Sequence, residues 1–398
     1  MQVSERIKSM QASPIRKLVP YADKAKAEGK KVYHLNIGQP DIETPKVFFD
    51  AVKAFERPVI AYANSQGEKV MIESMVKYYA KHNMGFDYDD IIITQGGSEA
   101  LIFAIFAVTD PEDEVIVAEP FYTNYNGFAS VTGAKLKAMT TVAEEGFHLP
   151  KREEIIKLIG KKTKAFLLAN PGNPTGTVYR KDEIQMIADI AKEYDLFIIA
   201  DEVYKEYVYD EEEFISFASL SDIKDRVIVT DSVSKRFSAC GARIGSISSK
   251  NPEVIKNILK LAQNRLCVAT IEQVAAAALV DTPDDYMEYS YNEYKSRRDA
   301  AYEALSKMDG VVCEKPKGAF YVIVKLPIEN AEDFALWMLT DFEDNKETVM
   351  FAPAEGFYAT KGLGKNEIRL SFCINTESVK RAMELLELGL RKYKESHK

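Results

Sequence analysis

The chain has 398 residues, of which 46% are hydrophobic and 28% charged, a composition typical of a globular protein. This length allows two or three domains and a large core, so no disulfide or metal is needed for stability. The net charge of −9 argues against a general nucleic-acid binder, because such proteins are basic. The four cysteines and four histidines form no CxxC or HExxH motif, so we expect no metal site.

No segment is typical of a membrane protein or of an exported one. The longest purely apolar run, Ala100 to Val108, is far shorter than the ~20 residues that span a bilayer. The opening residues, Met1 to Pro14, lack the apolar centre of a signal peptide. We therefore expect a cytoplasmic protein that does not bind a membrane.

In chain order, the first predicted part is an α/β unit. Residues 1–45 contain no strand pattern long enough for a core, so we expect them to pack on another part or on a partner chain. Short β-branched runs that are apolar on both faces follow, and helical patterns such as 98–108 and 181–194 separate several of them. This alternation predicts a mostly parallel sheet with helices on both faces. The runs are 91–94, 114–118, 165–169, 196–200 and 226–230.

The pattern changes at about residue 284. A long charged helix is predicted over 284–308, and alternation at 318–325 predicts a strand. A helix at 331–339, a strand at 367–372 and a closing helix at 377–393 follow. We therefore expect a large domain over 46–283 and a smaller α+β domain formed by 284–398 with the N-terminal segment 1–45.

Polar side chains follow the apolar runs. A glycine turn, residues 95–100, opens a helix whose N-terminus is able to bind an anion such as phosphate. The rigid loop 170–176 is able to aim an Asn amide, and Asp201 comes directly after the fourth run. Lys235 and Arg243 follow the fifth. Taken singly, each also has a structural explanation: a helix cap for the glycine turn and for Asp201, a plain turn for the loop 170–176, and a surface position for Lys235.

Together these residues match one cofactor. The carboxyl ends of parallel strands share one edge of a sheet, so a phosphate cradle, an Arg, an Asp, a Tyr, an Asn and a Lys are expected to converge there. Pyridoxal 5'-phosphate binds through a lysine Schiff base, and an aspartate partners its ring nitrogen. The set therefore predicts a pyridoxal-phosphate site.

The ordered motifs also resemble a known family. They are GQPD at 38–41, Tyr62 to Gly67, GGSEA at 96–100, NPGNPTG at 170–176, DEVY at 201–204 and SVSK at 232–235. In these, and nearly end to end, the chain resembles the class I (aspartate aminotransferase-like) pyridoxal-phosphate-dependent aminotransferases of fold type I. The resemblance implies a homodimer that moves an amino group from an amino acid to a 2-oxo acid by a ping-pong reaction.

The resemblance also implies roles for single residues. Lys235 would hold the cofactor and move the proton, and Asp201 would pair with the ring nitrogen. Tyr204 and Asn173 would hydrogen-bond the phenolic oxygen, while Tyr122 would stack on the ring. The remaining implied contacts are Gly97, Ser98, Glu99, Ser232, Arg243 and the neighbouring subunit's Tyr62 for the cofactor, and Gly38, Asn173 and Arg369 for the substrate carboxylate.

The substrate is less well determined. Some bacterial relatives have a Lys that reads a distal carboxylate where this chain has Ser98. Arg16 and Arg265 are the remaining candidates, and we favour Arg265 because relatives contribute to the partner's active site from its segment. We expect an aspartate/glutamate-type enzyme, with an aromatic- or alanine-type enzyme as the alternative. A carbon–sulfur lyase of the same fold, or a binding protein without activity, fits less well, because Lys235 and Arg369 are both present.

Overall fold

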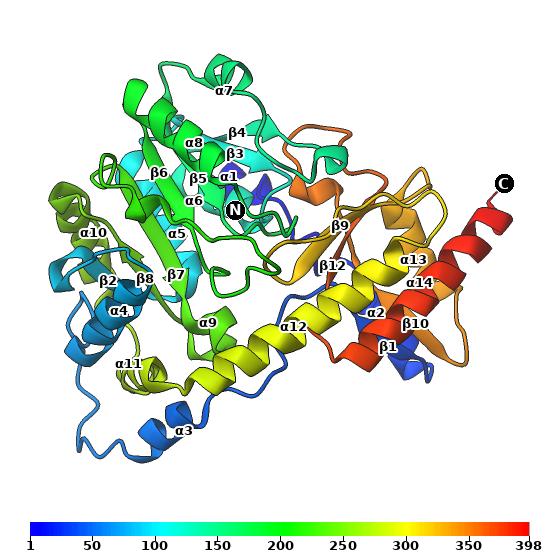
Figure 1. Cartoon of the computed structure of the whole chain (residues 1–398), viewed down its shortest axis with the longest axis horizontal. Coiled ribbons are helices and arrows are strands. Elements are labelled where there is room, and N and C mark those ends of the chain that lie inside the picture. The colour runs from blue at the N-terminus through cyan, green and yellow to red at the C-terminus, as the bar shows by residue number, and fades with distance from the viewer. Residues whose placement is uncertain (398) are drawn as a thin grey trace.

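The larger part of the molecule is built on a seven-stranded sheet (Figure 1). The computed structural model describes residues 1–397. The strand order is β2-β8-β7-β6-β5-β3-β4, and β8 runs antiparallel to both of its neighbours, while the other pairings are parallel. The strands are β2 (Ile91–Gln95), β3 (Glu114–Glu119), β4 (Lys135–Thr140), β5 (Thr163–Ala169), β6 (Phe197–Asp201), β7 (Val227–Ser232) and β8 (Ile244–Ser248).

Helices cover both faces of this sheet. Alternate strand residues point to opposite faces. Accordingly, Ile92 and Ile228 pack with α5 (Gly96–Val108) and α10 (Pro252–Arg265). Ile93 and Val229 pack on the other face with α4 (Lys69–Lys81) and α8 (Lys181–Glu193). The shorter helices of this part are α3 (Lys46–Lys53), α6 (Asn124–Thr132), α7 (Arg152–Leu158), α9 (Val233–Arg236) and α11 (Thr270–Ala277).

Two small sheets form the second part. One is antiparallel, with the order β11-β12-β9, and the other pairs β1 with β10 in parallel. Helix α12 (Asp284–Leu305) leads from the large sheet to this part, where α14 (Thr376–Ser396) lies beside it (Figure 1). The other elements are β1 (Lys31–His34), β9 (Tyr321–Lys325), β10 (Glu347–Met350), β11 (Ala352–Pro353), β12 (Glu367–Ser371), α1 (Glu5–Lys8), α2 (Val19–Ala27) and α13 (Ala331–Thr340).

The predicted α/β architecture is confirmed, with specific differences. All five apolar runs are strands of the large sheet. Two strands of the large sheet were not predicted: β4, whose lysines give it the polar pattern of an edge strand, and β8, in which one Gly and two Ser interrupt the apolar run. The strand expected from residue 318 begins at Tyr321, because Ala319 has a φ of +57°.

The N-terminal segment packs on the second part of the molecule. Strand β1 pairs with β10, and Leu18 and Tyr33 lie in the core formed around β9 and α14. All strands of the large sheet lie between residues 91 and 248, and those of the small sheets lie at 31–34 and 321–371. We therefore propose that the chain forms two domains, a large one over residues 46–283 and a smaller one made of residues 1–45 and 284–398. Over residues 1–397, no helix combines the length and apolarity that crossing a bilayer requires.

Candidate active site

A cavity of about 320 Å³ lies beyond the carboxyl ends of β6 and β7. Its walls come from both parts of the molecule, because β9 and β12 close the side opposite the large sheet. This volume suits a small cofactor with a substrate. The cavity is lined by most of the residues that the sequence selected: Gly38, Gly97, Ser98, Tyr122, Asn173, Asp201, Tyr204, Ser232, Lys235, Arg243 and Arg369.

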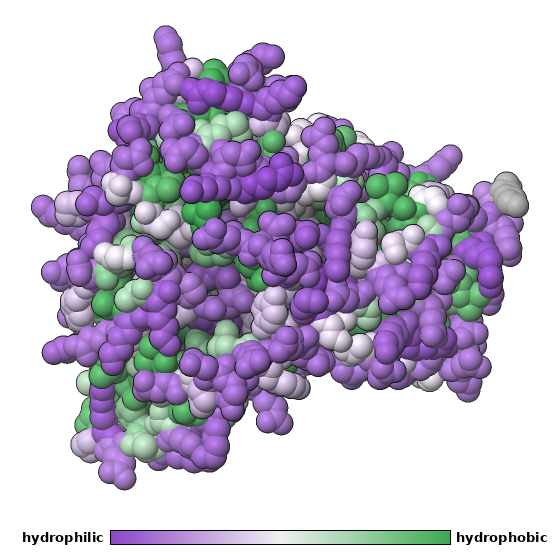
Figure 2. Space-filling view, in the orientation of Figure 1, coloured by the Kyte–Doolittle hydropathy of each residue, from purple (hydrophilic) through white to green (hydrophobic). Residues whose placement is uncertain are grey.

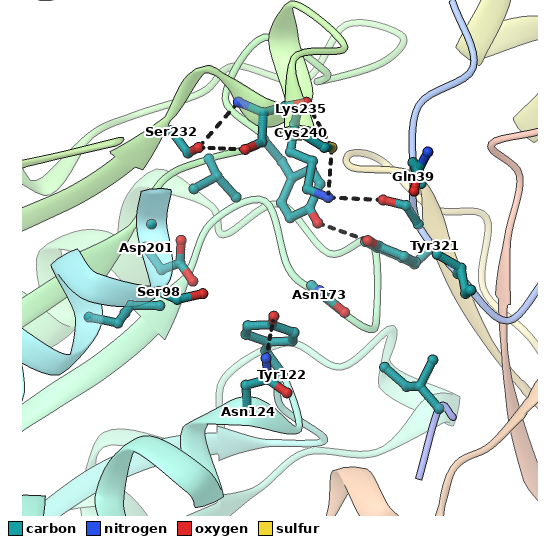
Figure 3. Close-up of a pocket in the computed structure, with 18 of the residues that line it drawn as sticks. Gln39, Ser98, Tyr122, Asn124, Asn173, Asp201, Ser232, Lys235, Cys240 and Tyr321 are labelled. Carbon is teal, nitrogen blue, oxygen red and sulfur yellow. Dashed lines mark hydrogen bonds between the residues drawn. The ribbon is translucent and has the colours of Figure 1, made fainter. Parts of the chain in front are cut away.

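Lys235 projects into the middle of this cavity (Figure 3). It lies on the single-turn helix α9, directly after β7. Its Nζ donates a hydrogen bond to the carbonyl oxygen of Gly38 at 2.9 Å and lies 4.0 Å from Cys240 Sγ. Gly38 approaches this closely because it has no side chain: a Cβ there would collide with the ring of Tyr321. A backbone carbonyl oxygen thus holds the amine in the cavity.

Asp201, at the end of β6, is buried with one oxygen unused. Its Oδ2 accepts a hydrogen bond from the Tyr125 hydroxyl at 2.7 Å. Its Oδ1 is buried and has no hydrogen-bond partner within residues 1–397. Burial is the main cause that raises the pKa of this carboxyl to about 6. A buried carboxylate is costly without a partner, so this oxygen fits a protonated ring nitrogen well.

The start of α5 forms an anion cradle. A Cβ on Gly96 would collide with the guanidinium of Arg243, and one on Gly245 would lie 2.7 Å from the backbone nitrogen of Gly97. The missing side chains therefore let Arg243 lie against the N-terminus of the helix. Ser232 and Ser98 line the cavity beside it. Free N–H groups, the helix dipole and a guanidinium together favour a phosphate.

Arg369, on β12, is a buried cation without a carboxylate partner among the described residues. Its side chain is 1% exposed. Nη2 donates to the Asn36 carbonyl oxygen at 2.5 Å and Nη1 to Asn173 Oδ1 at 3.3 Å, while Nε has no partner. Burial lowers the pKa of the guanidinium. A carboxylate that entered the cavity would supply the missing counter-charge through two parallel hydrogen bonds.

Known proteins share both this fold and this sequence pattern. Residues 30–386 match the family model described as aminotransferase class I and II. The chain belongs to this family. Its predicted fold type I architecture and its activity as an aminotransferase are thereby confirmed.

Relatives of this aminotransferase act on different amino acids. It is 32% identical over 391 residues to an aspartate aminotransferase of Thermotoga maritima. The aligned part covers 97% of this chain and 98% of that relative. It is 30% identical over 402 residues to aromatic-amino-acid aminotransferase 2 of Thermococcus litoralis, and the aligned part covers 99% of this chain and 100% of that relative. A solved alanine aminotransferase from Pyrococcus furiosus has a TM-score of 0.89 and 33% identity, with 98% and 100% covered. The names therefore leave the substrate to be argued from the site.

Two residues assigned to the cofactor do not line the cavity of this aminotransferase chain. Tyr62 is 81% exposed on the loop between α3 and α4. Glu99 accepts a hydrogen bond from the backbone of Gln95 at 2.8 Å, and its other oxygen lies 3.7 Å from Arg265 Nε. Arg265 itself donates to carbonyl oxygens of the chain and is not a lining residue, whereas Arg16 is.

The sequence analysis missed two tyrosines of the aminotransferase site. Tyr321 on β9 lies 2.8 Å from Tyr204, hydroxyl to hydroxyl. Tyr125 on α6 donates to Asp201. The alternation of apolar and polar residues predicted a strand over 318–325, but it did not show which side chains of that strand face the large sheet. Tyr122 precedes α6 (Asn124–Thr132), so helical spacing gave no signal for Tyr125.

Proposed function

We propose that this enzyme uses pyridoxal 5'-phosphate to move an amino group from an L-amino acid to a 2-oxo acid in a ping-pong reaction. The observation that carries the proposal is that Lys235, Asp201, Arg243 and Arg369 line one cavity. A cofactor with an aldehyde, a basic ring nitrogen and a phosphate requires the first three groups, and an amino-acid carboxylate requires the fourth.

The cofactor would be held by groups that otherwise lack partners. Asp201 Oδ1, which is buried and unbonded, would accept a hydrogen bond from the ring nitrogen. Arg243 and the start of α5 would bind the phosphate together with Ser98 and Ser232. Tyr204 and Asn173 would donate to the phenolic oxygen, and Tyr122 would lie against the ring.

When bound, pyridoxal 5'-phosphate supplies an aldehyde that condenses with amines and a ring that accepts electrons from a breaking Cα–H bond. Lys235 would hold the aldehyde, and its amine, once released by the substrate amine, would take the proton from Cα. Asp201 would keep the ring nitrogen protonated. Arg369 would bind the α-carboxylate and so orient the Cα–H bond towards Lys235.

The test is an amino-transfer assay with a lysine variant. Purified protein should be yellow and should transfer amino groups in a screen of donors against acceptors. Lys235→Ala should still bind the cofactor but lose turnover by several orders of magnitude, because it lacks the proton-transferring amine. Lys256→Ala, an exposed lysine on α10, is the matched control. Near-normal turnover of Lys235→Ala would contradict the proposal, and release of ammonia in place of transfer would indicate a lyase.

We also propose a homodimer in which Tyr62 reaches the partner's cavity. Hydrophobic side chains are exposed on α3 and on the loop that follows it: Phe49 (49%), Val59 (70%) and Ile60 (64%). Figure 2 shows hydrophobic residues gathered at the lower left of the molecule, over the region of α3 and α11. A contiguous apolar patch favours a protein contact. The family resemblance, which implies a homodimer, supports a second copy of this chain as the partner.

A further inference from the structure

The cavity holds more cations than the proposed reaction uses. Its lining residues include the cations Arg16, Lys235, Arg243 and Arg369, whereas Asp201 supplies the only carboxylate. Lys235, Arg243 and Arg369 have roles in the proposed function, on which this inference rests. Arg16 has none.

Arg16 is an exposed residue whose side chain is not engaged by other described residues of its own chain. It ends a turn in which its backbone N–H donates to the Ser13 carbonyl oxygen at 3.2 Å. Its guanidinium has no hydrogen bond or ion pair with any residue from 1 to 397, although it lines the cavity. The next residue, Lys17, does not line the cavity and pairs with Glu332 at 2.5 Å. A ligand is therefore able to recruit Arg16 without breaking an existing interaction.

The segment that carries Arg16 is tied to Arg369 through one buried residue. Asn36, which is 0% exposed, donates from Nδ2 to the Ile15 carbonyl oxygen at 3.2 Å. The backbone oxygen of the same Asn36 accepts from Arg369 at 2.5 Å. Ile15 also packs against the cluster that contains Phe357. The two arginines thus line one cavity with their backbones in a fixed relation.

We propose that Arg16 binds the side-chain carboxylate of a dicarboxylic substrate, so that aspartate, glutamate and their 2-oxo acids are preferred. A guanidinium pairs with a carboxylate through two parallel hydrogen bonds, and Arg369 and Arg16 provide one such partner for each end of the substrate. Arg265, favoured from the sequence for the partner's active site, does not line the cavity of its own chain and donates to the carbonyl oxygens of Ser65 and Ile93. Arg16 is proposed in its place because Arg16 lines the cavity and its guanidinium has no acceptor within the described residues.

The test compares four proteins on four donors. The kcat/KM of wild type, Arg16→Gln, Arg16→Lys and Lys17→Gln is measured with aspartate, glutamate, alanine and phenylalanine. Arg16→Gln should lose about 10²-fold on the two acids and stay within about threefold on the others, because only the acids lose a charged partner. Arg16→Lys should retain part of the preference. Lys17→Gln removes the same charge one residue away and should change nothing.

A binding measurement separates the inference from the proposed reaction. The dissociation constants of succinate and butyrate, which differ by one carboxylate, are measured by calorimetry on the same four proteins. Arg16→Gln should weaken succinate about tenfold or more and leave butyrate unchanged. An equal loss on all donors, or an unaltered succinate affinity in Arg16→Gln, would overturn the role of Arg16. A fifth protein, Arg265→Gln, should keep the preference for the two acids, and a selective loss there would also overturn it. A wild-type protein that transfers no amino group would refute the proposed function. The succinate measurement would still test whether Arg16 binds a carboxylate, because it does not depend on activity.

Discussion

Asp201 is held where its charge is unfavourable until a cation binds beside it. In the folded chain its pKa is raised from 3.8 to about 6, mainly by burial. The folded state therefore binds this proton more tightly than the unfolded state does. It follows that the contribution of Asp201 to the stability of the cofactor-free protein becomes less favourable as pH rises from about 3.8 to about 6 and stays so above that range.

Asp201→Asn should accordingly stabilise the cofactor-free protein. Asn keeps an acceptor for Tyr125 and never ionises, so we expect a gain of about 1–3 kcal/mol at pH 8, and a smaller gain at pH 5. Urea unfolding of the cofactor-free proteins at both pH values measures this. Cofactor affinity and turnover should fall in the same variant, because the ring nitrogen loses its anionic partner.

Glu202 provides the matched control for Asp201. Burial raises its pKa to about 7, yet it does not line the cavity and accepts a hydrogen bond from Ser216. Glu202→Gln should also stabilise the protein above pH 7 but leave cofactor affinity unchanged. If both variants lose cofactor equally, Asp201 has no special relation to the ring.

A buried cluster of charges lies behind the site. Asp231 Oδ2 pairs with Lys205 Nζ at 2.7 Å and Oδ1 with Arg236 Nη1 at 2.8 Å, and all three side chains are at most 2% exposed. Burial alone would raise the pKa of Asp231, but the two cations outweigh it and the pKa is lowered. Arg236 adjoins Lys235, so this cluster anchors the turn that presents the lysine.

Asp231→Asn should destabilise the protein by about 3–5 kcal/mol, because two buried cations lose their counter-charge. Adding Lys205→Met removes one of these cations and should restore part of the loss. Urea unfolding of the single and double variants measures both effects. A double variant less stable than Asp231→Asn would refute this charge-balance argument.

At the scale of elements, the close approach of β8 to the start of α5 shapes the anion cradle. A Cβ at Gly245 would lie 2.5 Å from the backbone carbon of Gly96 and 2.7 Å from the Asp231 carbonyl oxygen. Backbone atoms cannot rotate away as a side chain does. The contact therefore fixes the distance between the strand and the helix N-terminus.

Gly245→Ala should push these two elements apart. We expect a loss of stability of about 1–3 kcal/mol from overpacking and a weaker affinity for pyridoxal 5'-phosphate. Gly241→Ala, in the turn that precedes β8 and with no atom within 4 Å of the added Cβ, is the control and should alter neither quantity. Thermal unfolding and a cofactor titration distinguish the two variants. Unchanged cofactor affinity in Gly245→Ala would show that the cradle tolerates the shift.

At the scale of the whole molecule, the proposed shared site has a direct test. Tyr62→Phe should weaken cofactor binding by about 0.5–3 kcal/mol, the range for one hydrogen bond to a charged group. In a hybrid of Tyr62→Phe with Lys235→Ala, both defects fall in one cavity if Tyr62 acts across the interface. The hybrid should then regain one intact site of two, measured as recovered activity after subunit exchange. No recovery after proven exchange would argue that each cavity is complete within its own chain.

The sequence by itself determined the class of fold and the chemistry of the site. The five apolar runs became strands of one sheet because residues buried on both faces leave a local pattern. Asp201 and Lys235 converge because one ends β6 and the other follows β7, and the carboxyl ends of parallel strands share one edge of a sheet. Arg243 joins them because the antiparallel β8 begins at the same edge.

Only the tertiary structure decided which distant side chains meet. Tyr321 faces Tyr204, and Arg16 rather than Arg265 lines the cavity of its own chain, although the sequence favoured Arg265. These contacts join segments more than a hundred residues apart, and they depend on how β9 and the N-terminal segment pack against the large sheet. Local patterns record whether a residue is buried, but not which partner buries it. For that reason the sequence predicted the reaction but did not identify the residue that we propose to bind the substrate side chain.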